Sequence, residues 1–127
     1  MGYSGAILKN SENKILFQLR DNNPNAKNPN KWGIFGGGIK KRESPEKAII
    51  RELDEELGLY FTEGDLPKEH MIPLINYHIF EIQLKKIPRK SDLKEGKAMK
   101  FMNKEEFFKT KNGLLRVKIF LKFLNID

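Results

Sequence analysis

The feature that most constrains the fold is a helix whose start and end are both marked in the sequence. Ser44 is a favourable N-cap, because its hydroxyl can accept a hydrogen bond from an amide of the first turn. Pro45 suits the first helical position, and Gly58 favours the left-handed conformation that ends many helices. The sequence therefore predicts a helix between these marks, preceded by the three glycines Gly36–Gly38.

One side of this helix is acidic. Glu52, Glu55 and Glu56 are three and four residues apart, so their side chains share a face. Arg51 lies four residues before Glu55, close enough to pair with it. The neighbouring stripe is apolar and is expected to pack on a sheet; it consists of Ile50, Leu53 and Leu57.

Clustered carboxylates raise one another's pKa values unless a cation neutralises them. Mg²⁺ fits this cluster, because it binds a few carboxylates, keeps several waters and takes substrate phosphates as further ligands. Mn²⁺ suits the same oxygen ligands. A solvated acidic surface helix is the alternative interpretation of the same pattern.

The rest of the chain alternates short apolar stretches with helical patterns. Asn103, with Glu106 three residues later, predicts the capped start of a short helix, and a closing helix is expected at Leu114–Leu124. Asp21–Lys31 and Ser91–Gly96 are expected to be polar loops. Strands are expected at Gly5–Leu8, Ile15–Leu19, Trp32–Phe35, Ile72–Ile75, Tyr77–Leu84 and Ala98–Met102. This mixture implies an α/β or α+β sandwich, and residues 1–127 are expected to form a single domain because no linker divides them.

Composition narrows the range of partners. The net charge of +7 favours polyanions such as nucleotides or nucleic acid, although scattered, solvated lysines would give the same value. The chain has no cysteine, which excludes disulfides and thiolate metal sites and suits a cytoplasmic location. No apolar run is long enough to span a bilayer and the N-terminus lacks a signal-peptide pattern, so no membrane association is expected.

The glycines and the acidic helix together resemble a known family motif. The pattern G-x5-E-x7-R-E-U-x-E-E-x-G-U, with U aliphatic, is the Nudix box, and every specified position is filled here. The matching residues are Gly37, Glu43, Arg51, Glu52, Leu53, Glu55, Glu56, Gly58 and Leu59. The resemblance continues in WGIFGGG before the box, and in KEGKAMKFM after it, where Glu95 matches a loop glutamate of MutT-like members.

The resemblance implies a Nudix α/β/α sandwich with a mixed sheet between helices. It also implies metal-dependent hydrolysis of a nucleoside diphosphate linked to another group. Glu52, Glu55 and Glu56 would be metal ligands together with the Gly37 carbonyl. Glu43 and Arg51 would orient those ligands. Glu52 and Glu95 would be the two candidates for the general base.

Substrate contacts are less clearly marked. Lys40 and Arg42 depart from residues common in the family and could touch phosphate, although a solvated role is the stronger interpretation. Trp32 and Tyr77 could stack on a base if they line the cleft, and core packing is the stronger interpretation for both.

The chain is little longer than a catalytic domain, which favours a small MutT-like enzyme over the ADP-ribose and nucleotide-sugar members. The expected reaction is conversion of a nucleoside triphosphate to its monophosphate and pyrophosphate, with an oxidised purine triphosphate as one candidate substrate. Removal of a 5′ cap or triphosphate from RNA is the second enzymatic hypothesis, encouraged by the positive charge. A catalytically silent nucleotide-binding module is the third. The sequence is compatible with a monomer or a homodimer.

Overall fold

The computed structural model describes residues 2–23, 25, 28–66, 68–72, 75–124 and 126. Within these ranges, seven strands form one mixed sheet. The strands are β1 (Tyr3–Lys9), β2 (Ile15–Leu19), β3 (Trp32–Gly33), β4 (Phe35–Gly38), β5 (Lys68–Ile72), β6 (Tyr77–Gln83) and β7 (Ala98–Met102). Three α-helices accompany them, α1 (Pro45–Leu57), α2 (Lys104–Lys109) and α3 (Leu115–Phe123). Short 3-10 turns, η1 (Glu63–Asp65) and η3 (Lys90–Asp92), interrupt two of the loops.

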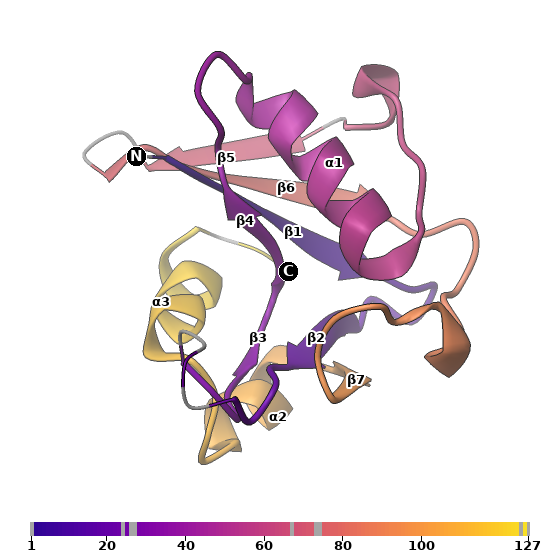
Figure 1. Ribbon diagram of the computed structural model, residues 1–127. Coiled ribbons are helices and arrows are strands. Elements are labelled where there is room, and N and C mark those ends of the chain that lie inside the picture. Colours follow the sequence, from indigo (N-terminus) through magenta and orange to yellow (C-terminus); the bar gives the residue numbers. More distant parts are fainter. Residues whose placement is uncertain are drawn as a thin grey trace.

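The centre of the sheet is β1, which pairs in parallel with β6 from Tyr3 opposite Tyr77 to Lys9 opposite Gln83. The principal strand order is β3-β2-β1-β6-β5. β4 pairs antiparallel with β1, and β7 pairs antiparallel with β2. Figure 1 shows α1 crossing the sheet on one side, with the segment that leads to β7 passing the end of this helix.

Each face of the sheet has its own hydrophobic core, because neighbouring residues of a strand point to opposite faces. Ile7 belongs to one cluster and Leu8 to the other. The first cluster packs the sheet against α2 and α3 through Phe107, Val117, Phe120 and Leu121. The second packs it against α1 through Ile49, Leu53 and Leu57. The expected α/β/α sandwich is therefore confirmed.

The marks at the two ends of α1 act as the sequence predicts. The Ser44 hydroxyl accepts a hydrogen bond from the Lys47 amide at 3.1 Å. Gly58 adopts a left-handed conformation with φ of 65°, and its amide donates to the Asp54 carbonyl at 2.9 Å. The expected apolar stripe is wrong at one position. Ile49 is fully buried whereas Ile50 is half-buried, because the face packed on the sheet is centred one residue earlier.

The strand expected at Ile72–Ile75 is also misplaced. The observed strand β5 runs from Lys68 to Ile72, and Ile75 lies in a turn. Pro73 and Leu74, which that expectation included, lie outside the described residues. Among the described residues β5 pairs with β6 alone, so it is an edge strand. Its side chains are mostly polar, so it lacks the apolar signal on which the expectation depended. The single strand expected at Trp32–Phe35 is wrong as well, because this stretch is divided between β3 and β4, and β4 continues to Gly38. The other expected strands and helices are present, with ends that shift by a residue or two.

In the described part of the chain, no helix has the length and hydrophobicity that crossing a membrane requires.

Candidate active site

A small polar pocket opens where α1, β4 and the loop before β7 meet. Its volume is about 140 Å³, and it is lined by Gln18, Arg20, Asp21, Gly36, Glu52, Glu56, Glu95 and Gly96. Four of these residues carry carboxylates and one carries a guanidinium. The pocket therefore holds four carboxylates, whose oxygens can bind a cation, beside the positive charge of Arg20.

Glu56 occupies a position of α1 that faces the protein interior. It is only 4% exposed, and its Oε1 atom accepts a hydrogen bond from the Gly36 amide at 2.9 Å. Burial, reinforced by the nearby charge of Glu52, raises the pKa of this carboxyl to about 8. A buried carboxylate that is costly to ionise therefore lines the pocket.

Two glycines of β4 permit close approaches, Gly36 to the backbone of β1 and Gly37 to Glu52 of α1. Gly36 has a φ of 146°, and a Cβ atom there would lie 2.2 Å from the Ser4 carbonyl oxygen, so the position accepts only glycine without strain. A Cβ atom on Gly37 would instead lie 2.5 Å from Oε1 of Glu52. Because Gly37 has no side chain, the Glu52 carboxylate can lie directly against its backbone.

Arg51 holds the outer carboxylates in place. Its guanidinium donates from Nε to one oxygen of Glu43 at 2.8 Å and from Nη2 to the other at 2.9 Å. It also donates to Glu52 at 2.8 Å, to Glu55 at 3.4 Å and to the Gly38 carbonyl at 3.1 Å. The hydrogen bond from Arg51 lowers the pKa of Glu43 to about 2. The two residues form a charged clamp that fixes the orientation of Glu52.

The opposite wall comes from the loop before β7. The side-chain amide of Gln18 donates from Nε2 to the Glu95 backbone carbonyl at 2.8 Å. The backbone amide of Lys97 donates to the Leu19 carbonyl, also at 2.8 Å. These bonds tie the loop to β2 and place Glu95 opposite α1. Partial burial and the charges of Glu52 and Glu55 raise the pKa of Glu95.

The structure gathers some predicted site residues and separates others. Glu52, Glu56 and Glu95 line the pocket, whereas the Glu55 side chain is 47% exposed and is not part of the lining. Among the described residues, no three His, Cys, Asp or Glu side chains form a group that could hold a metal ion as they stand. The four residues expected at the substrate do not line this pocket. Lys40 and Arg42 are exposed, and Trp32 and Tyr77 pack against the core beneath α3.

Sequence reasoning did not single out Gln18, Arg20, Asp21 or Gly96 as site residues. Gln18 carried a usable signal, since a polar residue at a buried position of an apolar strand needs a specific partner; it is 4% exposed. Arg20 and Asp21 stand where β2 opens into the polar loop. The spacing of these residues in the sequence does not link them to α1. They come near α1 through the pairing of β2 with β1 and β7.

A family model described as the NUDIX domain matches residues 3–122. The chain therefore belongs to the Nudix family.

Solved structures of the family share the fold. A MutT protein from Methanosarcina mazei superimposes with a TM-score of 0.72 and 19% identity, covering 96% of this chain and 90% of that one. A MutT Nudix hydrolase from Burkholderia pseudomallei gives a TM-score of 0.69 and 20% identity, with 95% of each chain covered.

Curated relatives match over a shorter stretch. The RNA pyrophosphohydrolase of Gluconacetobacter diazotrophicus is 42% identical over 57 residues, which are 42% of this chain and 34% of the relative. That of Cellvibrio japonicus is 43% identical over 56 residues, which are 44% of this chain and 30% of the relative. The match spans about a third of the length of these relatives.

Proposed function

We propose that this protein is a metal-dependent hydrolase that cleaves a phosphoanhydride bond in a nucleotide carrying a 5′ polyphosphate. The observation that carries the proposal is the pocket in which Glu52, Glu56 and Glu95 converge beside Arg20. In this reaction the oxygen of water bonds to one phosphorus, the bridging P–O bond breaks, and the departing phosphate keeps the electron pair.

The donor set fits a hard divalent cation. The anionic groups of the pocket are all carboxylates, and its lining, as far as the structure describes it, contains neither histidine nor sulfur. Glu52 and Glu56 would hold the cation, with Glu55 and the Gly37 carbonyl as further ligands. A cation such as Mg²⁺ would neutralise phosphate charge and activate water.

The chain's own residues prepare the pocket for this chemistry. The Gly36 amide holds one oxygen of Glu56 and leaves the other available, while Arg51 fixes Glu52 from outside the pocket. Glu95 is the second candidate for the base, because its raised pKa makes it a better proton acceptor than an ordinary carboxylate. Arg20 offers a positive charge to a phosphate.

A free nucleoside triphosphate is the first candidate substrate, with ADP-ribose and nucleotide sugars as less favoured small-molecule alternatives. The 5′ triphosphate of an RNA chain is the second candidate, favoured by two observations. The curated relatives are RNA pyrophosphohydrolases, although the matched stretch is short, and the chain carries a net charge of +7. The two substrates present the same anhydride to the pocket and differ only beyond the first nucleotide.

The decisive experiment compares hydrolysis of these substrates with Mg²⁺, with Mn²⁺ and with a chelator. Glu56→Gln keeps the size of the side chain and removes its charge, and Asp54→Asn makes the same change on the exposed side of α1. We expect metal-dependent turnover that falls by at least about a hundredfold in Glu56→Gln and stays close to wild type in Asp54→Asn.

The outcomes separate the alternatives. Turnover of triphosphorylated RNA that exceeds that of free triphosphates and falls steeply with salt would identify the RNA enzyme. Metal and nucleotide binding without any turnover would contradict hydrolysis and support the binding-module hypothesis.

A further inference from the structure

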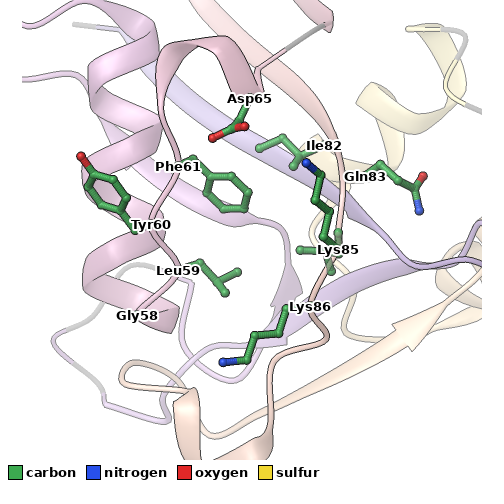
Figure 2. A pocket seen from close by; sticks show the side chains of 10 residues that line it. Gly58, Leu59, Tyr60, Phe61, Asp65, Ile82, Gln83, Lys85 and Lys86 are labelled. Carbon is green, nitrogen blue, oxygen red and sulfur yellow. The ribbon is translucent and has the colours of Figure 1, made fainter.

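A second and larger cavity lies beyond the C-terminal end of α1. Its volume is about 360 Å³, within the range of small-molecule sites. Among the described residues, it shares no lining residue with the pocket of Glu52, Glu56 and Glu95, the carboxylate pocket. One wall is the segment 58–61 that follows α1, and the other is the end of β6 with the residues after it (Figure 2).

The floor of this cavity is apolar because of how α1 ends. The left-handed Gly58 turns the chain, and the next three residues alternate, with Leu59 and Phe61 half-buried and Tyr60 80% exposed. Figure 2 shows the rings of Tyr60 and Phe61 pointing in opposite directions. Ile82 and Leu84 are buried and complete the floor. A planar ring could therefore lie against Phe61 on an apolar surface.

The rim is mainly basic. Lys85 and Lys86 are both exposed and follow Leu84 at the end of β6. Asp65 stands at the rim near Lys85, where hydrogen bonds from Thr62 and the Lys85 charge lower its pKa. A phosphate would be repelled on the Asp65 side and attracted toward Lys86. Lys94 adds a third amine on that side, since its Nζ lies 3.5 Å from where a Cβ of Gly58 would stand.

We propose that this cavity binds a nucleotide, with the base on the floor beside Phe61 and the phosphate between Lys86 and Lys94. The aromatic ring and the apolar floor select a planar group, and the amines select an anion. The site is separate from the proposed reaction, and it exists whether or not the carboxylate pocket hydrolyses a substrate.

Two sources could supply this nucleotide, a free mononucleotide or a downstream nucleotide of an RNA chain. The second is geometrically feasible because the Lys94 side chain lies beside Gly58, which lines the cavity, while its neighbour Glu95 lines the carboxylate pocket. In addition, the Lys94 amide donates to the Glu56 carbonyl at 2.8 Å, which ties this segment to the end of α1.

The test is a titration followed by backbone amide NMR in the presence of EDTA, so that no metal-dependent cleavage occurs. The probes are AMP, ribose 5-phosphate and a short single-stranded RNA with a 5′ phosphate. AMP is expected to shift the amides of Leu59–Phe61, Lys85 and Lys86 in a saturable way. Ribose 5-phosphate is expected to bind much more weakly, because it lacks the base that the floor recognises.

The charge requirement is tested with the combined substitution Lys86→Gln and Lys94→Gln. Its matched control, Lys109→Gln with Lys111→Gln, removes the same charge from exposed sites near α2. The first pair is expected to weaken AMP about tenfold, and the control pair to change binding by less than about twofold.

RNA that binds at least about tenfold more tightly than AMP and shifts amides around both pockets would assign the site to a downstream nucleotide. Equal affinities would assign it to a free nucleotide. Three results would overturn the proposal: shifts confined to the carboxylate pocket, equal binding of ribose 5-phosphate, or no saturation at millimolar AMP.

Discussion

The carboxylate of Glu56 occupies a position that an ordinary amphipathic helix would give to an apolar residue. Leu53 and Leu57, beside it on α1, are buried in the core. Burying a charge there would be unfavourable without partners, and the structure supplies the Gly36 amide on one side and an open pocket on the other. The site therefore depends on the close approach of β4 to α1.

The two neighbouring glycines of β4 should respond differently to substitution. Gly36→Ala forces a side chain into the Ser4 carbonyl at a strained φ, and it should lower the free energy of unfolding by about 2 kcal/mol or more. Gly37→Ala meets the carboxylate of Glu52, which can move away by giving up its contact with Arg51, so it should destabilise the protein less than Gly36→Ala while removing most of the activity. Urea unfolding measured beside a hydrolysis assay separates the two effects. Equal destabilisation by both substitutions would contradict this assignment.

Glu43 should contribute stability that depends on pH. Its pKa is lowered from 4.5 to about 2 by the hydrogen bond from Arg51. A carboxyl whose pKa is depressed by folding stabilises the protein above its unfolded value of 4.5 and loses that contribution as the pH falls toward 2.

Glu43→Gln should therefore be less stable than wild type at pH 7, and the difference should shrink below pH 4.5. Urea unfolding at a series of pH values measures the difference directly. Glu12→Gln, in an exposed turn, is the control and should show no such trend. A gap that stays constant down to pH 3 would count against the Arg51 clamp.

At the level of secondary structure, α1 offers a test of which face packs on the sheet. Ile49 is fully buried against the second core, whereas its neighbour Ile50 is half-buried. Ile49→Ala should lower the free energy of unfolding by about 2–5 kcal/mol, and Ile50→Ala by about 1 kcal/mol. Denaturant unfolding of the two variants measures both losses of stability. A larger loss for Ile50→Ala would support the apolar stripe that the sequence predicts, with Ile50 on the packed face.

The contrast between α1 and β5 explains how much of the fold the sequence could predict. α1 begins and ends at the capping residues Ser44 and Gly58, and α2 begins at the N-cap Asn103. Because capping residues act locally, both helices can be predicted from a short stretch of sequence. β5 is specified instead by its pairing with β6, since Lys68–Ile72 has no continuous apolar face. Pairing between distant segments leaves little signal in a single stretch of sequence.

The same distinction applies to the site. The Nudix box lies in one stretch of chain, so Glu52, Glu56 and Arg51 could be named from the resemblance that this stretch carries. Gln18 and Asp21 reach the pocket only through the pairing of β2 with β1 and β7, which no local pattern of residues describes.

For the molecule as a whole, the sheet separates two cores that should contribute independently to stability. Ile15 belongs to the cluster beneath α2 and α3, and Ile49 to the cluster beneath α1. Each Ile→Val substitution should cost about 0.5–1.5 kcal/mol, and the double variant should equal their sum within about 0.5 kcal/mol. Equilibrium unfolding of the four proteins in this cycle measures the coupling. A coupling above about 1 kcal/mol would mean that the two faces respond to each other through the sheet.

The pairing of β7 with β2 also has a consequence for synthesis of the protein. α1 and its carboxylates leave the ribosome well before Glu95, which the Gln18 side chain then holds in place. A nascent chain that ends before Glu95 has the acidic helix without the opposite wall of the pocket. The pocket is therefore completed only after this loop has left the ribosome, and the following strand β7 then pairs with β2.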